Sequence, residues 1–167
     1  MREKGLLGLL VTACYVLSIT TICVAEMHSQ KNGLFKVDIP DGWSWAELSG
    51  KVRIGNPKGN AGISIQFKPV LVESDEKRKE RLKTGNQMMI KSMVEPNKGT
   101  VLSERERRIN GVYARQLDFL TTLEGKTGQM TYISFFNKDY AFTITFASPN
   151  DEEILKMEEI VETFQFQ

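Results

Sequence analysis

Few residues of this 167-residue sequence have the type and spacing that catalysis requires. His28 is the single histidine, and it lies in a polar stretch where no nucleophile or carboxylate is fixed beside it, so we expect it to be exposed to solvent. The two cysteines, Cys14 and Cys23, fall in an apolar N-terminal segment. If that segment is removed, the mature chain has neither a Cys nucleophile nor a Cys/His zinc site. We therefore predict no catalytic residue, no metal site and no cofactor.

Asp118 is the carboxylate that best merits consideration for acid–base chemistry. It lies in an expected strand, Val112–Leu120, where alternation places it on the same face as Ala114 and Gln116. If that face is buried, the pKa of Asp118 would be perturbed and the residue would be a site candidate. The simpler interpretation is a partly exposed carboxylate that pairs with a basic residue of a neighbouring strand. The acidic run Asp151–Glu153 lacks the spaced ligands and glycine of a calcium loop, and it suits the start of a helix.

Two aromatic and three basic residues are candidates for a binding surface. Trp43 and Trp45 are two positions apart and so share one side of an extended chain. Aromatic residues anchor many interfaces, although at the start of a strand they more often close one end of a core. Arg105, Arg107 and Arg108 form a dense basic spot that could contact a lipid headgroup or an acidic partner, within a mixed-charge run typical of a solvated face.

The overall charge excludes one class of partner. Lys plus Arg number 22 and Asp plus Glu 21, so no basic excess exists to bind the phosphate backbone of a nucleic acid. The glycine-rich run Gly55–Gly62 lacks the Gly-Lys-Ser/Thr ending of a phosphate-binding loop and suits a hairpin loop. With 41% hydrophobic residues, the chain fits one globular domain.

Residues 1–25 have the three parts of a secretory signal. Met1–Lys4 is short and charged, and Gly5–Ala25 is an almost uninterrupted apolar run that ends in small residues. We therefore predict cleavage between Ala25 and Glu26. The mature chain would be formally neutral and free of cysteine, so its core alone must stabilise it, which favours a bacterial envelope protein.

Two alternatives to cleavage remain open. Residues 5–25 are long enough to stay as a membrane anchor, and residues 11–14 resemble a bacterial lipobox that would place a lipid on Cys14. In every case the folded part lies outside the cytoplasm, in the periplasm or beyond the cell. Residues 26–32 are expected to be a polar tether, and residues 33–167 a single domain.

Alternating apolar residues from Leu34 onward predict strands joined by hairpins. Phe35, Val37 and Ile39 share one face of the first strand. The dipeptide Asn110-Gly111 is the best short signal for a type I′ hairpin turn. Strands are expected at residues 35–39, 52–54 and 63–67, in a hairpin over 100–123, and in a second hairpin of residues 130–136 and 140–147 after a turn at 125–128.

Two helices are expected to cover the sheet. Residues 74–94 predict a helix with Ser74 or Asp75 as the N-cap. A second helix is expected after Ser148, with Ser148 as its cap and Pro149 in its first turn. Because each helix has one apolar stripe, each must pack on a sheet face. The predicted fold class is α+β, an antiparallel sheet flanked by helices.

The order of these motifs resembles that of PsbP-like domains (the PsbP/DcrB-type superfamily), over about 130 residues. The matching segments are Phe35-x-Val37-x-Ile39-Pro40-x-Gly42-Trp43, Ile109-Asn110-Gly111-x-x-Ala114-x-x-Leu117-Asp118-Phe119, Tyr140–Ala147 and Ile160-Val161-x-x-Phe164. The resemblance implies an α–β–α sandwich that acts by binding other proteins and that has no catalytic residues to carry over. A member with a plain export signal would be a bacterial envelope protein.

We therefore expect an exported, non-enzymatic domain that binds another envelope protein. The alternative is a binder of a lipid or another small molecule, with an apolar pocket between sheet and helix rich in Met88, Met89 and Met93. A hydrolase that uses carboxylates alone is the least favoured hypothesis. No expectation names the partner, the ligand or the oligomeric state.

Overall fold

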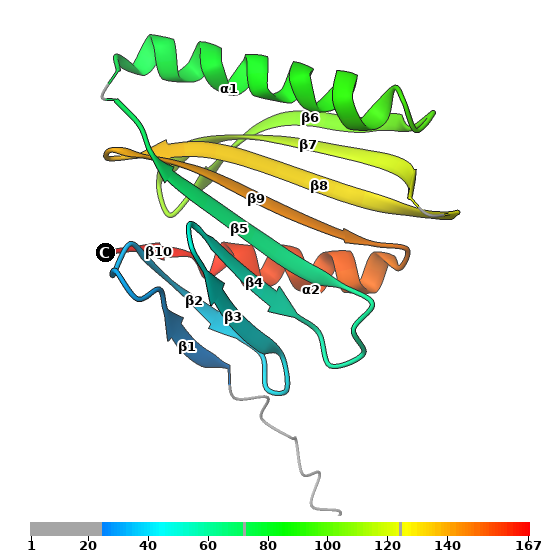
Figure 1. The fold of residues 1–167 in the computed structure, drawn as a ribbon, viewed down its shortest axis with the longest axis horizontal. Coiled ribbons are helices and arrows are strands. Elements are labelled where there is room, and N and C mark those ends of the chain that lie inside the picture. The colour runs from blue at the N-terminus through cyan, green and yellow to red at the C-terminus, as the bar shows by residue number, and fades with distance from the viewer. Residues whose placement is uncertain (1–24, 72, 124) are drawn as a thin grey trace, which may run out of the picture.

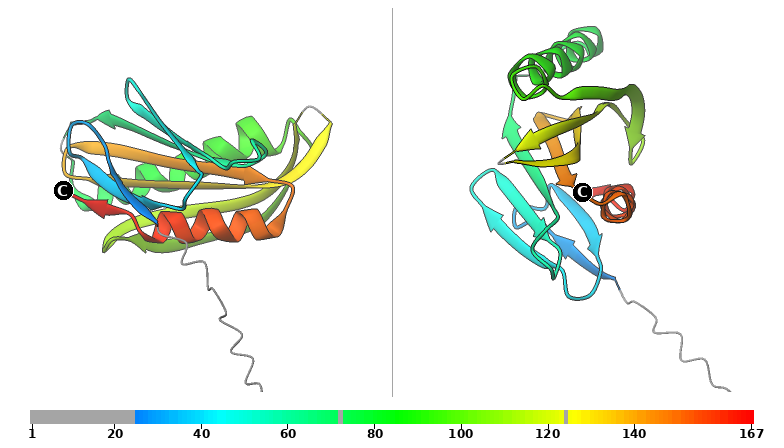
Figure 2. Two further views of the ribbon diagram at one scale, coloured as in Figure 1. Left: turned by 90° about the horizontal axis from the view of Figure 1, so that it is seen from below. Right: turned by 90° about the vertical axis from the view of Figure 1, so that its right-hand side faces the viewer.

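The computed structural model describes residues 25–71, 73–123 and 125–167 of the chain. A seven-stranded antiparallel sheet lies between helix α1 on one face and helix α2 on the other, and a small three-stranded sheet lies beside α2 (Figures 1 and 2). This arrangement confirms the predicted α+β class. The elements in chain order are β1 (Glu26–Ser29), β2 (Phe35–Ile39), β3 (Ser44–Leu48), β4 (Lys51–Gly55), β5 (Gly62–Pro69), α1 (Asp75–Met89), a π-helical turn η1 (Ile90–Val94), β6 (Thr100–Ile109), β7 (Val112–Leu123), β8 (Lys126–Asn137), β9 (Tyr140–Ser148), α2 (Asp151–Glu162) and β10 (Gln165–Phe166).

The large sheet has the strand order β3-β4-β5-β9-β8-β7-β6, and every neighbouring pair is antiparallel. The β6–β7 hairpin turns at Asn110 and Gly111, whose φ angles of 46° and 81° confirm the predicted type I′ turn. The β7–β8 connection is tighter than expected. β8 begins at Lys126 rather than Met130, because residues 126–129 pair with the end of β7 instead of forming a turn.

The main core lies between the large sheet and the layer of α2 and β2. Phe142, Ile144 and Phe146 of β9 point into it, as their period-two spacing predicted. Phe35 of β2 is completely buried and stacks on Phe164 with ring centroids 4.6 Å apart. The two ends of the domain are therefore joined through this aromatic cluster.

Helix α2 begins two residues later than the sequence suggested. Its N-cap is Asn150, whose side chain accepts a hydrogen bond from the backbone N–H of Glu152 at 2.8 Å, and not Ser148. Ser148 is still the last residue of β9 and pairs with Gln129, and the first helical residue is Asp151, so the capping position falls on Asn150. Its hydroxyl instead accepts from the N–H of Asn150 at 3.1 Å.

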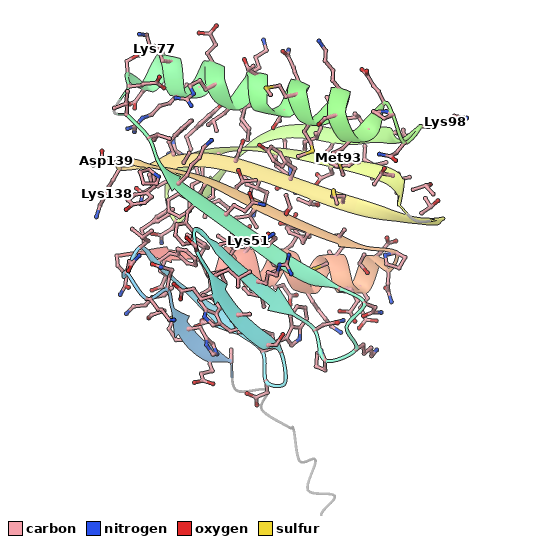
Figure 3. All side chains as sticks on the ribbon, in the orientation of Figure 1. Lys51, Lys77, Met93, Lys98, Lys138 and Asp139 are labelled. Carbon is pink, nitrogen blue, oxygen red and sulfur yellow. The ribbon has the colours of Figure 1, made fainter. Side chains whose placement is uncertain are left out.

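Helix α1 begins as predicted, with Ser74 as the N-cap accepting from the N–H of Lys77. It covers the other face of the sheet through a second apolar cluster of Val94, Leu117 and Phe119. The helical stretch does not stay regular to its end, because residues 90–94 form a π-helical turn. Met93, labelled in Figure 3, packs against this second cluster.

The stretch expected to be a polar tether is structured. Residues 26–29 form β1, which pairs antiparallel with β2, and Gln30 is buried and donates to Glu47 at 2.7 Å. Pairing along the edge of β2 needs only backbone groups, so an edge strand with polar side chains carries no hydrophobic signal. The expected signal segment, apart from Ala25, lies outside the described residues. Within those residues, no helix has both the length and the apolar character needed to cross a bilayer.

Candidate functional site

A groove of about 820 Å³ lies between α1 and the sheet surface beside it. Met88 and Met89 line it from the helix, and Tyr132, Ser134 and Thr143 line it from β8 and β9. The strands supply these residues because alternate side chains of β8 and β9 point away from the main core. The groove is thus a concave, largely apolar surface on the α1 side of the sheet.

The helix that forms one wall of this groove is held by few contacts. Only Leu82 and Asn86 of α1 are buried. The amide of Asn86 donates to Glu104 at 3.1 Å, and Arg115 donates to the same carboxylate oxygen at 2.7 Å. Burial alone would raise the pKa of Glu104, but the hydrogen bonds from Arg115 and Asn86 outweigh it and lower that pKa. This polar contact fixes α1 over β6 and β7, and the groove opens on its other side.

The groove contains a buried hydroxyl and a charged rim. The side chain of Ser134 is 5% exposed, and its Oγ has no hydrogen-bond partner among the described residues. Lys68 and Lys77 lie at the rim, together with Arg81, which pairs with Glu73 at 2.8 Å. A buried hydroxyl without a partner is costly, so it is a natural contact for a bound group.

On the opposite face of the sheet, Asp118 belongs to a buried polar network under α2. It is 7% exposed, so the burial considered from the sequence is present and the expected partial exposure is wrong. The expected pairing with a basic residue of a neighbouring strand is present, because Nε of Arg105 on β6 lies 4.0 Å from Oδ2 of Asp118. Its oxygens accept from Ser103 at 2.6 Å, Gln116 at 2.7 Å and Thr131 at 2.8 Å. With three internal donors, this carboxylate is satisfied by the fold. It holds β6, β7 and β8 in register.

The three arginines of the basic spot lie on different sides of β6. The side chain of Arg107 is 11% exposed and donates to Gln116, Glu158 and Glu162, so it links the sheet to α2. Arg105, on the same face, is about half exposed. Arg108 points to the α1 side of the sheet, where it lines a smaller cavity of about 330 Å³. Alternation along the strand separates residues that are adjacent in sequence, so they do not form one patch.

The two tryptophans pack partly against the main core. Trp43 precedes β3 and Trp45 lies within it, and both are half-buried. Trp45 stacks on His28 of β1 with ring centroids 5.5 Å apart, so His28 is not the freely exposed residue that the sequence suggested. This places both aromatic side chains at the end of the core formed by β1, β2 and β3, away from the groove.

Sequence reasoning found one wall of the groove and missed its floor. Of the three methionines expected in the pocket, Met88 and Met89 line the groove, whereas Met93 packs against the second apolar cluster. Ser134 and Thr143 look like ordinary strand residues. The signal that could have found them is the apolar–polar alternation of β8 and β9, which directs small hydroxyl residues to one face. Among the described residues, no three His, Cys, Asp or Glu side chains are grouped so that they could hold a metal ion.

Comparison with solved structures identifies the fold. The structure is similar to cyanobacterial PsbP (CyanoP) from Synechocystis sp. PCC 6803, with a TM-score of 0.67 and 10% identity over 94% of this chain and 99% of that one. It is also similar to LpqN of Mycobacterium tuberculosis, described as involved in cell envelope biogenesis (TM-score 0.58, 14% identity, 85% of this chain and 90% of that one). The Ran-binding protein Mog1p of Saccharomyces cerevisiae gives a TM-score of 0.57 with 11% identity, over 85% and 95% of the two chains.

The sequence comparisons add no closer relative. No protein-family model matches the chain, and no curated protein matches it. The chain therefore has the PsbP-like fold, and at these identities the likeness extends to the fold alone.

Proposed function

We propose that this PsbP-like chain is an exported, non-catalytic domain that binds a protein partner in the cell envelope. The observation that carries the proposal is the groove beside α1, a large and mostly apolar concavity. Among the described residues that line it, no hydrogen bond joins a hydroxyl to a carboxylate or an amine. Asp118, the carboxylate that was the strongest catalytic candidate, lies on the α2 face of the sheet. Its oxygens already accept hydrogen bonds from three side chains of the fold. Two proteins of similar fold, a Ran-binding protein and an envelope-biogenesis protein, support a binding role.

The test is co-purification from intact cells. A C-terminally tagged copy is cross-linked in its native cells, purified, and its companions are identified by mass spectrometry against an untagged control. One dominant envelope protein is the expected result, and no enrichment above the control would overturn the proposal.

Export is tested on the same purified material by N-terminal sequencing. We expect the mature chain to start at Glu26, which is also the first residue of β1. A start at Met1 would show an uncleaved segment, and a lipidated start at Cys14 would show the lipoprotein alternative.

A second candidate function is the binding of a small amphiphile in the groove. The observation that favours it is the combination of Met88 and Met89 on the wall with the unpartnered hydroxyl of Ser134 on the floor. Native mass spectrometry of the protein purified without denaturation would show a bound lipid or small molecule as a discrete mass increment. Loss of that increment in Met88→Glu, with the fold intact, would place the ligand in the groove.

A further inference from the structure

Within the described residues, no helix lies over the part of the α1 face that β3, β4 and β5 form. In Figure 1, α1 lies along β6, β7 and β8, while α2 passes behind β4 and β5 and no helix lies in front of them. The right-hand view of Figure 2 shows the same outer surface uncovered. This open face consists of the outward side chains of β3, β4, β5 and β9, and the groove forms its border with α1.

The open face carries positive charge and no acidic residue. The strand register places Lys51 beside Gln66 and Arg53 beside Ser64, and Lys68 beside Ala141. No ion pair involves these three cations in the part of the chain that the structure describes. The side chains on this face are Ser44, Ala46 and Leu48 of β3, Lys51 and Arg53 of β4, Ser64, Gln66 and Lys68 of β5, and Ala141, Thr143, Thr145 and Ala147 of β9. The groove that borders this face has the carboxylates Glu73 and Glu80 in its lining, and Glu73 pairs with Arg81. Three cations without ion pairs, on strands whose outward side chains include no carboxylate, are complementary to an acidic partner.

The small side chains of the open face allow the backbone of a partner to approach it closely. Its central residues on β9 are alanine and threonine, which leave room for a neighbouring backbone. Ser134, directly across from Thr143 on β8, is 95% buried and has no hydrogen-bond partner. The hydroxyl of Ser64 on β5 is also buried without a partner. A buried hydroxyl without a partner, at the edge of an uncovered face, indicates that a polar group of a bound molecule supplies the missing hydrogen bond.

We propose that the open face binds an acidic amphipathic helix of a protein partner, which lies across β9 and β5 alongside α1. This rests on the proposed protein-binding function and names its surface. Helices pack about 8–10 Å apart, which is about two strand spacings of 4.8 Å. A helix next to α1, which lies over β7 and β8, would therefore sit over β9 and β5. Its apolar side would contact Met88 and Met89, and its acidic side would face Lys51, Arg53 and Lys68.

The dimensions of the face also fit a helix. β5 has eight residues, a length of about 26 Å, which corresponds to about 17 residues of helix. The cations extend from Lys68 of β5, at the groove, to Lys51 and Arg53 of β4, one strand beyond it, and this spread is wider than the headgroup of one amphiphile requires. The charge distribution thus favours an extended acidic segment over a single lipid in the groove.

Site-specific photo-cross-linking tests the proposal in native cells. A benzophenone amino acid replaces the exposed Gln66 on the open face or, as a control, Leu155, which is 63% exposed on α2. We expect the Gln66 probe to link to an acidic helical segment of one protein and the Leu155 probe not to link to it.

The double reversal Lys51→Glu with Lys68→Glu should lower the cross-linking yield about tenfold or more, because like charges then face each other. The matched reversal of Lys58 and Lys98, away from this face, should leave the yield unchanged.

Other outcomes overturn the proposal. An acidic helix on this face is excluded if the probe links to a lipid, to a second copy of this chain, or to a peptide without an excess of acidic residues. It is also excluded if the charge reversal leaves the cross-linking yield unchanged. Raising the ionic strength should also lower the wild-type yield, which tests the charge complementarity without any variant that could misfold. If a partner co-purifies but links only elsewhere, the protein-binding function stands and this surface fails. If no partner co-purifies at all, both fail.

Discussion

Replacing Arg107 with alanine should destabilise the fold by about 2–3 kcal/mol, although the sequence suggests an exposed basic residue. The side chain of Gln116 is completely buried, and its carbonyl loses the donor that Arg107 supplies, which costs about 1–3 kcal/mol. Glu158 loses a 2.7 Å ion pair but keeps a 2.9 Å hydrogen bond from Gln116 and is 21% exposed, so it adds at most about 1 kcal/mol. The pair with the mostly exposed Glu162 adds little.

The assay is urea and thermal unfolding of the mature chain, followed by circular dichroism. The loss corresponds to a fall in Tm of about 6–9 °C for a domain of this size. Arg105→Ala and Arg108→Ala are the matched controls. Both side chains are largely exposed, and the ion pairs of Arg105 with Glu158 at 3.6 Å and Asp118 at 4.0 Å are screened by solvent, so each substitution should change the free energy of unfolding by less than about 1 kcal/mol. Equal stability of all three variants would refute the conclusion that alternation separates these arginines into structural and surface roles.

The remaining predictions concern the core, the helix and the pH dependence. Phe35→Ala should lower the free energy of unfolding by about 3–5 kcal/mol in urea titrations, because it empties the centre of the aromatic cluster. Gly85→Ala should raise stability by up to about 1 kcal/mol, since its new methyl group would have only ordinary contact with Tyr132 and alanine favours the helix; a loss of stability would contradict this packing. The lowered pKa of Glu104 stabilises the fold above the usual glutamate pKa of about 4.3, and this contribution disappears as the pH falls through the lower folded value. Unfolding at a series of pH values should therefore show a smaller acid-induced loss for Glu104→Gln than for the wild type, and equal losses would contradict the role of Arg115 as its partner.

Strand faces and turns were predictable because they depend on near neighbours in sequence. The alternation of Phe142, Ile144 and Phe146 identified the buried face of β9. Asn110-Gly111 identified the turn between β6 and β7 by backbone preference alone. The N-cap at Ser74 was found in the same way.

Elements whose formation depends on a distant strand were not predictable. β1 and β10 are short and carry few apolar residues, and each exists because an edge of β2 is available for pairing. The cap of α2 shifted to Asn150 because strand pairing continues to Ser148 and the helix begins only at Asp151. In both cases tertiary pairing outweighed local preference.

By itself, the sequence determined the α+β class, the hairpins, the two helices and the methionines of the groove wall, since each of these is encoded in the spacing of residues close together in the chain. Only the tertiary structure decided that Asp118 and Arg107 make buried hydrogen bonds, that Lys51 and Lys68 share one uncovered face, and that Ser134 lies buried at the edge of that face. That face is assembled from strands far apart in sequence. Because strand order and register decide which residues meet on it, no pattern of neighbouring residues in the sequence predicts it.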